Sequence, residues 1–186
     1  FMLAQHHLDA MILGVDISNH AIELALRNKA AIPFAANVSF IHKHFNDLNN
    51  DLIPLDLIIC NPPYFKSSLL PVNLERQRQR HATNFNFDSF ATFSNRHLVK
   101  DGCVCMVIPY YFETELSFRM SLEGLYLLDL VIVKHTDSSE PSLCLCRYVL
   151  RQGKLNKTNL ILFKDDNTLT PAFRDLTYPF LNFNKE

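Results

Sequence analysis

The tetrapeptide Asn61-Pro62-Pro63-Tyr64 contains the residues whose types and spacing are best suited to chemistry. It follows the apolar run from Leu55 to Cys60, which predicts a buried strand. The two prolines fix their own φ angles, remove two backbone donors and hold the preceding residues in extended geometry. The result is a stiff loop that offers carbonyl oxygens and an amide side chain next to an aromatic ring. Such a loop can bind an exocyclic amine while the ring stacks on the attached base, as methylation of an amino nitrogen requires.

The tetrapeptide also matches the Asn/Asp/Ser-Pro-Pro-aromatic signature of the class I S-adenosylmethionine-dependent amino-methyltransferases, which the chain resembles over nearly its whole length. Within that group the chain is most similar to the bacterial tRNA1(Val) adenine-37 N6-methyltransferases. Three further segments support this closer resemblance. They are the stretch Gly14 to Ser18, the basic stretch Glu75 to His81 and the tail Phe173 to Phe183.

The resemblance implies that S-adenosylmethionine is the cofactor and that the acceptor is the exocyclic N6 amine of an adenine in tRNA. It makes Asn61, Pro62 and Tyr64 the expected catalytic residues. The Asn61 side chain and the Pro62 carbonyl would accept the two N–H bonds of the amine, and Tyr64 would stack on an unstacked base. No strong general base is needed, because the proton leaves after the nitrogen becomes cationic. We therefore expect most of the acceleration to come from positioning and electrostatic preorganisation.

Asp16 ends the apolar run that begins at Ala10, and nucleotide-type cofactors bind beyond such strand ends in open α/β sheets. The resemblance implies that Asp16 accepts hydrogen bonds from the ribose hydroxyls of the cofactor. It also makes Ile17, Asp47 and Asn61 cofactor-binding residues, with Asp47 at the adenine amino group. Alternatively, Asp16 is only a carboxylate that the dipole of the following helix stabilises at its N-terminus. Asp47 can likewise be an ordinary turn residue in a loop.

The chain has one concentrated positive patch, between the tetrapeptide and the next predicted helix. We expect it to contact RNA phosphates, because alternate arginines in an extended loop can aim several guanidinium groups at one strand. The alternative is a solvated surface loop, as most charge runs are. The patch consists of Arg76, Arg78, Arg80 and His81.

Short apolar strands alternate with amphipathic helices along the chain, which predicts an α/β fold. The resemblance specifies a Rossmann-like class I methyltransferase sheet with helices on both faces and an antiparallel hairpin at one edge. Only four glycines are present, and none forms a glycine-rich turn before Asp16. We therefore expect that the first strand and the glycine-rich loop of that fold are missing, and that residues 1–186 form a single, N-terminally partial domain.

Composition is ordinary for a globular protein, with 48% hydrophobic and 20% charged residues and a net charge of −1. Binding to tRNA must therefore use a local patch rather than the field of the whole protein. No apolar run reaches the roughly 18 residues that a membrane span needs, and the N-terminus has no signal-peptide layout. These features predict a cytoplasmic protein with no membrane partner, which we expect to be a monomer.

Four of the five cysteines alternate in two predicted strands, Cys103 with Cys105 and Cys144 with Cys146. Two such pairs can offer four thiolates to zinc, but small cysteines also pack well against a covered sheet face. Packing is favoured, because zinc ligands are usually spaced as CxxC on turns. We predict no metal site.

Two other functions remain open at this stage. The same tetrapeptide serves N5-methylation of protein glutamine, and a comparison of tRNA and protein acceptors separates that reaction from adenine methylation. The chain can also be a non-catalytic fragment that at most binds RNA, since loss of a central strand leaves unpaired sheet edges. A strand and a glycine-rich turn upstream of Phe1 would exclude that alternative.

Overall fold

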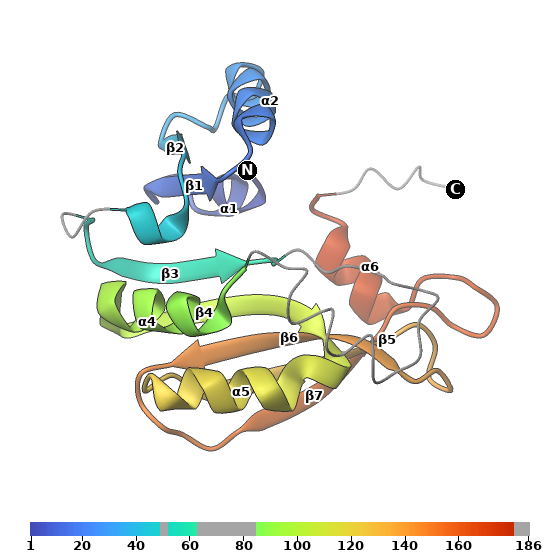
Figure 1. Cartoon of the computed structure of the whole chain (residues 1–186). Helices are drawn as coiled ribbons and strands as arrows, with labels where there is room; N and C mark the ends of the chain where they lie inside the picture. Colours follow the sequence, from blue (N-terminus) through green and yellow to red (C-terminus); the bar gives the residue numbers. More distant parts are fainter. Residues whose placement is uncertain (49–51, 63–84, 181–186) are drawn as a thin grey trace. The chain divides into compact units, whose positions relative to one another are not determined.

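The computed structural model describes residues 1–48, 52–62 and 85–180. They divide into two compact units, Phe1–Leu52 and Ile53–Glu186. Both units combine helices with strands, as the α/β prediction required (Figure 1). That all 186 residues form a single domain stays a prediction.

The first unit is a β–α–β motif. The parallel strands β1 and β2 pair from Ile12 with Val38 to Asp16 with His42, and α2 connects them. Ser18 caps the start of α2, since the Ser18 Oγ accepts a hydrogen bond from the Ala21 N–H at 3.2 Å. The elements are α1 (Met2–His6), β1 (Ile12–Asp16), α2 (Asn19–Ala30), β2 (Val38–His42) and the short 3₁₀ helix η1 (Phe45–Asp47).

A small core on one side of this strand pair contains Ala4, Ala35 and Val38, with Phe40 packed against it. Gly14 pairs with Phe40 across the two strands. A Cβ at position 14 would lie 2.6 Å from the Phe40 ring, so the glycine makes room for that side chain. Gly14 therefore has a packing role inside β1.

The second unit contains a five-stranded sheet with the order β3-β4-β6-β5-β7. Strands β3 and β4 are parallel, β6 is antiparallel to both β4 and β5, and β7 is parallel to β5. The strands are β3 (Leu55–Cys60), β4 (Leu98–Pro109), β5 (Tyr126–Lys134), β6 (Pro141–Val149) and β7 (Asn156–Ile161). The helices are α4 (Phe87–His97), η2 (Tyr110–Phe112), α5 (Glu113–Leu122) and α6 (Pro171–Thr177).

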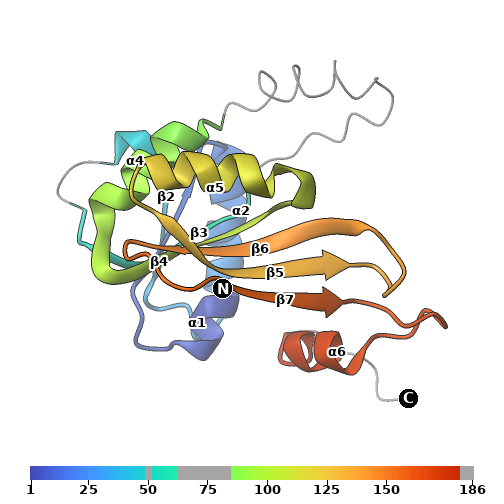
Figure 2. The ribbon, with the colours of Figure 1, turned by 90° about the horizontal axis from the view of Figure 1, so that it is seen from below.

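Helices lie on both sides of this sheet, as predicted: α4 and α5 on one side and α6 on the other, beside β7 (Figure 2). Alternate residues of β4 and β6 are buried, among them Met106 and Tyr148. The Tyr148 hydroxyl lies 3.1 Å from the Ser117 Oγ on α5. Leu116 and Met120 of α5 are fully buried. The main core therefore lies between the sheet and α5.

Two local predictions need correction. The antiparallel hairpin of β5 and β6 forms as predicted, but β7 pairs with β5, so β7 and not the hairpin is the sheet edge. The run from Leu55 to Cys60 was predicted to be a buried strand, but only Ile58 of β3 is buried, because β3 is the last strand of the sheet and pairs only with β4 among the described strands. The stretch Lys100 to Gly102, whose composition is typical of a turn, is part of β4. Its turn-like composition fits a register shift in the pairing with β3, between Leu55 and Leu57.

The cysteine pairs face opposite sides of the sheet. Cys105 is opposite Arg147 and Met106 is opposite Cys146, so the pair in β4 and the pair in β6 alternate out of phase. Cys144 and Cys146 are buried with their sulfurs 3.7 Å apart, and Cys103 and Cys105 are half-buried. These four thiols therefore cannot ligate one zinc ion.

Replacing Gly102 with alanine should destabilise the fold. A Cβ there would lie 2.9 Å from the Leu55 carbonyl oxygen and 3.0 Å from that of Asp56, and neither oxygen can move without disturbing β3. The expected loss in unfolding free energy is about 1–3 kcal/mol. Gly153→Ala is the matched control, because its Cβ would meet only the movable tip of Leu128. Equal losses in urea unfolding of the two variants would contradict this explanation.

Unfolding free energy should also depend on the charge of Asp129. Asn156 donates to Asp129 Oδ1 at 3.0 Å and Arg147 Nε donates to Oδ2 at 2.6 Å, and these bonds hold the pKa of Asp129 below its ordinary value. The stabilisation is present above the unfolded pKa of about 3.9 and is lost as pH falls through the lower folded pKa.

Asp129→Asn should therefore flatten the fall in unfolding free energy between about pH 5 and pH 2. Denaturant titrations at a series of pH values would measure this slope. The control is Asp175→Asn, which changes an exposed carboxylate of α6. An unchanged slope in Asp129→Asn would exclude the proposed contribution of Asp129.

Candidate active site

Asn61 and Pro62 directly follow β3, at the edge of the sheet where β3 and β4 both end. Parallel pairing of Cys60 with Met106 places the two strand ends side by side, and both arrows point the same way in Figure 1. Asn61 is exposed and Pro62 is buried. The Asn61 amide makes no hydrogen bond to any described residue. It is therefore available to bind a polar group of a ligand.

Cys60, immediately before Asn61, stays uncharged at physiological pH. Burial raises the pKa of its thiol to about 12. A thiol with such a pKa is a poor nucleophile, since the thiolate is the reactive species. This environment is that of a cysteine that packs as part of its strand.

Phe85, the next described residue after Pro62, belongs to an aromatic cluster beside the end of β4. The Phe85 ring lies 5.0 Å from that of Phe87 and 5.2 Å from that of Phe90, measured between centroids. The Phe87 ring in turn lies 4.9 Å from that of Phe112 in η2, which directly follows β4. The start of α4 is thus packed against the same strand end that adjoins Asn61.

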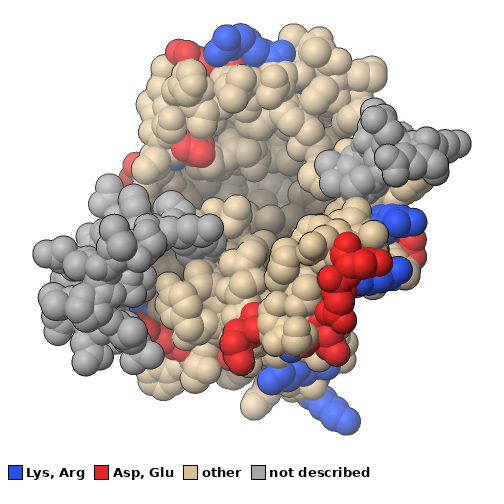
Figure 3. Space-filling model, turned by 90° about the vertical axis from the view of Figure 1, so that its right-hand side faces the viewer, with Lys and Arg blue, Asp and Glu red and all other residues tan. Residues whose placement is uncertain are grey.

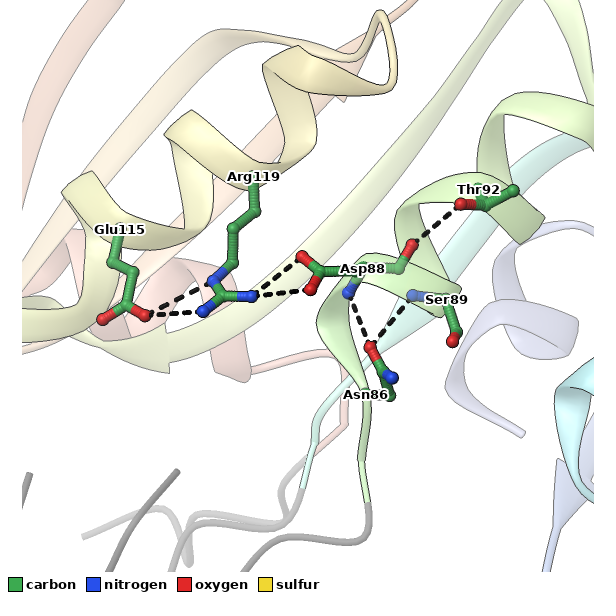
Figure 4. Close-up of polar contacts among 6 residues, drawn as sticks. All are labelled: Asn86, Asp88, Ser89, Thr92, Glu115 and Arg119. Carbon is green, nitrogen blue, oxygen red and sulfur yellow. Dashed lines mark hydrogen bonds and ion pairs between the residues drawn. The ribbon is translucent and has the colours of Figure 1, made fainter. Parts of the chain in front are cut away.

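Polar contacts also hold the start of α4 (Figure 4). The Asn86 side chain accepts hydrogen bonds from the backbone N–H groups of Asp88 and Ser89 at 3.0 and 3.1 Å, as an N-cap should. Arg119 of α5 donates to both carboxylate oxygens of Asp88 at 2.8 Å and to Glu115 at 3.0 Å. The hydrogen bonds that Arg119 donates to Asp88 raise the pKa of Arg119. The ion pair between Arg119 and Asp88 therefore ties α4 to α5 close to the start of α4.

In the first unit, Asp16 and Asp47 lie beyond the carboxyl ends of neighbouring parallel strands. Asp16 is the last residue of β1 and is exposed. Its Oδ1 accepts a hydrogen bond from the Ser18 N–H at 2.7 Å. Asp47 ends η1, which follows β2 and is capped by His44, whose Nδ1 accepts from the Asn46 N–H at 3.2 Å. Both carboxylates are exposed at the same edge of the strand pair.

These residues fit a ribose-bearing cofactor. The second carboxylate oxygen of Asp16 has no hydrogen bond to the described residues, so it can accept from a hydroxyl group. Ile17, which is 60% exposed, offers an apolar surface beside that carboxylate. No role at the site was predicted for His42, whose Nε2 lies 2.9 Å from the Ile17 carbonyl oxygen. A histidine at a strand end gives no sequence signal for such a contact.

The structure thus places the predicted residues in two sets: Asp16, Ile17 and Asp47 in the first unit, and Asn61 and Pro62 in the second. The remaining predicted residues lie outside the described ranges. They are Tyr64, Arg76, Arg78, Arg80 and His81.

The described residues have mixed charge near the strand ends of the second unit. Figure 3 views the side toward which β3 and β4 point, and its lower part shows Lys and Arg next to Asp and Glu. Lys164 is followed by Asp165 and Asp166 in the loop after β7, for example.

Two classes of feature are absent from the part of the chain that the structure describes. No described helix is both long and apolar enough to cross a membrane. No group of three or more His, Cys, Asp or Glu side chains in the described ranges is arranged to hold a metal ion.

Comparison with known proteins identifies relatives over most of the chain. A sequence model of the family described as "RMKL-like, methyltransferase domain" matches residues 2–110. A tRNA1(Val) (adenine(37)-N6)-methyltransferase from Escherichia fergusonii is 26% identical, over 98% of this chain and 75% of its own length. A protein of the same name from Shigella sonnei is 25% identical with the same coverage.

Solved structures share the fold at low sequence identity. A predicted O-methyltransferase from Agrobacterium tumefaciens superposes with a TM-score of 0.70 at 15% identity, covering 91% of this chain and 77% of the other. A 16S rRNA (adenine(1408)-N(1))-methyltransferase from Catenulisporales acidiphilia, solved with its cosubstrate SAM, gives a TM-score of 0.56 at 14% identity. It covers 82% of this chain and 80% of its own. These likenesses show that the fold is that of the class I methyltransferases, as predicted.

Removing the Arg119 ion pairs should cost little stability but should show a clear salt dependence. Arg119→Met keeps most of the aliphatic stem and deletes the bonds to Asp88 and Glu115. The side chains of Arg119 and Asp88 are 32% and 61% exposed, so we expect a loss of about 1 kcal/mol or less that shrinks at high salt.

Denaturant unfolding at low and high ionic strength would measure this effect. Arg151→Met is the control, because Arg151 is exposed and has no ion pair with a described residue. A salt-independent loss in Arg119→Met would show that lost packing, and not lost charge, explains the change.

Proposed function

This chain belongs to the RMKL-like methyltransferase domain family, and on that premise we propose that it transfers a methyl group from S-adenosylmethionine to the N6 amine of an adenine in tRNA. The names of its relatives support this substrate, since they are tRNA1(Val) adenine-37 N6-methyltransferases. The N5-glutamine reaction and a non-catalytic, RNA-binding role are not favoured, because no observation supports either over adenine methylation.

The observation that carries the proposal is the position of Asn61 and Pro62. They follow a strand of a parallel pair, at the carboxyl ends of the strands, where open α/β folds bind their ligands. The Asn61 amide is exposed and has no hydrogen bond to the described residues. Pro62 is buried and its ring restricts the backbone of Asn61, so the amide is presented from a fixed backbone.

We assign Asp16, Ile17 and Asp47 to the cofactor. The Asp16 carboxylate accepts hydrogen bonds from the ribose hydroxyls, and its own bond from the Ser18 N–H fixes its orientation. Asp47 accepts from the adenine amino group, and Asn61 also contacts the cofactor. When bound, S-adenosylmethionine supplies a methyl group activated by a positively charged sulfur.

The tetrapeptide binds and orients the acceptor amine. The lone pair of an adenine N6 is delocalised into the ring, which makes it a weak nucleophile. The Asn61 side-chain oxygen and the Pro62 carbonyl oxygen accept the two N–H bonds and favour a pyramidal nitrogen. Tyr64 stacks on the unstacked base. Positioning supplies most of the acceleration, and water accepts the proton after methyl transfer.

The remaining assignments follow from the same proposal. Arg76, Arg78, Arg80 and His81 contact the phosphates of the tRNA, which places the sequence-independent part of RNA binding next to the tetrapeptide in the chain. The protein acts as a monomer in the cytoplasm and uses no metal ion.

Asn61→Ala should reduce methyl transfer by at least about 100-fold, as expected for loss of one preorganised acceptor at the reacting group. Its dissociation constant for S-adenosylmethionine should stay within about threefold of the wild type, because Asn61 is only one of four assigned cofactor contacts. Transfer of labelled methyl to unmodified tRNA1(Val), followed by nucleoside analysis, would measure both the rate and the product.

Cys60→Ala is the matched control, since Cys60 adjoins Asn61 but has no assigned role in the chemistry. It should retain turnover. Near wild-type transfer by Asn61→Ala would refute the mechanism. Labelling of a glutamine-containing protein acceptor instead of tRNA would refute the substrate.

A further inference from the structure

The carboxyl ends of β1 and β2 are joined by the side chain of His42. Its Nε2 lies 2.9 Å from the Ile17 carbonyl oxygen, which can only accept, so Nε2 carries the hydrogen and donates it. His42 is the last residue of β2 and is the register partner of Asp16. The Lys43 N–H donates to the Asp16 carbonyl at 3.1 Å. Cross-strand bonding thus continues one residue beyond the end of β1.

The turn from β1 into α2 is therefore held at successive residues. The Asp16 carbonyl is bound by Lys43, the Ile17 carbonyl by His42, and the Ser18 N–H by the Asp16 carboxylate at 2.7 Å. Ile17 is 60% exposed, so burial does not fix this residue. The imidazole of His42 is the side chain from β2 that fixes the Ile17 peptide.

We propose that His42 is a positioning residue for the cofactor, an inference that rests on the proposed function. It holds the peptide group between Ile17 and Ser18, whose N–H binds the Asp16 carboxylate, and through that group it sets the direction of the Asp16 carboxylate and the Ile17 side chain. Its own contact is with the protein backbone, so it acts through Asp16 and Ile17. Loss of the His42 hydrogen bond therefore weakens cofactor binding and leaves the rate at saturating cofactor unchanged.

The chain contains a matched contact at the opposite end of the same strands. The Ser39 Oγ donates to the Ile12 carbonyl at 3.4 Å, again from a β2 side chain to a β1 carbonyl. Ser39→Ala removes a cross-strand bond far along the strands from Asp16. If His42 only stabilised the strand pair, removal of either bond would have the same kind of effect.

Calorimetric titration of S-adenosylmethionine into the full chain tests the inference, with wild type, His42→Gln, His42→Asn and Ser39→Ala compared. The amide nitrogen of glutamine can take the place of Nε2, whereas asparagine is too short to reach the Ile17 carbonyl. We expect the Kd of His42→Asn to rise about three- to tenfold, and His42→Gln and Ser39→Ala to stay within about twofold. Thermal unfolding of each variant and steady-state kinetics complete the test. In His42→Asn the KM for cofactor should rise and kcat should not change.

The outcomes separate the role of His42 in cofactor binding from a general contribution to strand pairing and from failure of the proposed cofactor site. Equal Kd values for wild type and His42→Asn would overturn the role of His42 while leaving the proposed function intact. A Kd that rises in Ser39→Ala as much as in His42→Asn, together with equal falls in Tm, would assign the effect to strand pairing and also overturn it. No saturable binding by folded wild type would overturn the proposed cofactor site, and the role of His42 with it.

Discussion

Parallel strand pairing is the constraint on which the candidate site depends, because it brings the carboxyl ends of neighbouring strands to one edge. In the first unit it places Asp16 of β1 beside His42 of β2. In the second it places the end of β3, and hence Asn61, beside the end of β4. Residues far apart in the chain thus become neighbours without direct bonds between their side chains. Within each unit, the residues proposed for the chemistry lie directly after strands whose ends this pairing holds side by side.

Features set by short-range interactions could be predicted from the sequence. The run from Leu55 to Cys60, apolar except for Asp56, coincides with β3, although only Ile58 of it is buried. Ser18 caps α2 and Gly124, with a φ of 75°, follows the end of α5, and both residue types are typical of those positions. The positions of Asp16 and Asn61 at strand ends follow from the same local signals. Their roles came from resemblance to a family and not from the pattern itself.

Features set by long-range pairing could not be predicted in this way. The stretch Lys100 to Gly102 has the composition of a turn, yet its place in β4 is decided by contact with β3, which lies some forty residues earlier. The partner of β7 is likewise a matter of sheet topology, so its edge position was missed. The contact between His42 and the Ile17 carbonyl depends on strand register, which a single sequence does not encode in any local motif.

The antiparallel hairpin of β5 and β6 has a consequence for the order in which the second unit folds. Its strands are joined by a short loop between Lys134 and Pro141, so their pairing closes a small loop of chain. Pairing of β3 with β4 must close a loop that includes the whole of α4 and all residues between Cys60 and Phe87. Because the entropy lost on closure grows with loop length, the hairpin is the favoured nucleus of the sheet. β3, which Asn61 directly follows, then pairs with a sheet that is already forming. The strand next to the candidate active site is therefore the later one to join the sheet.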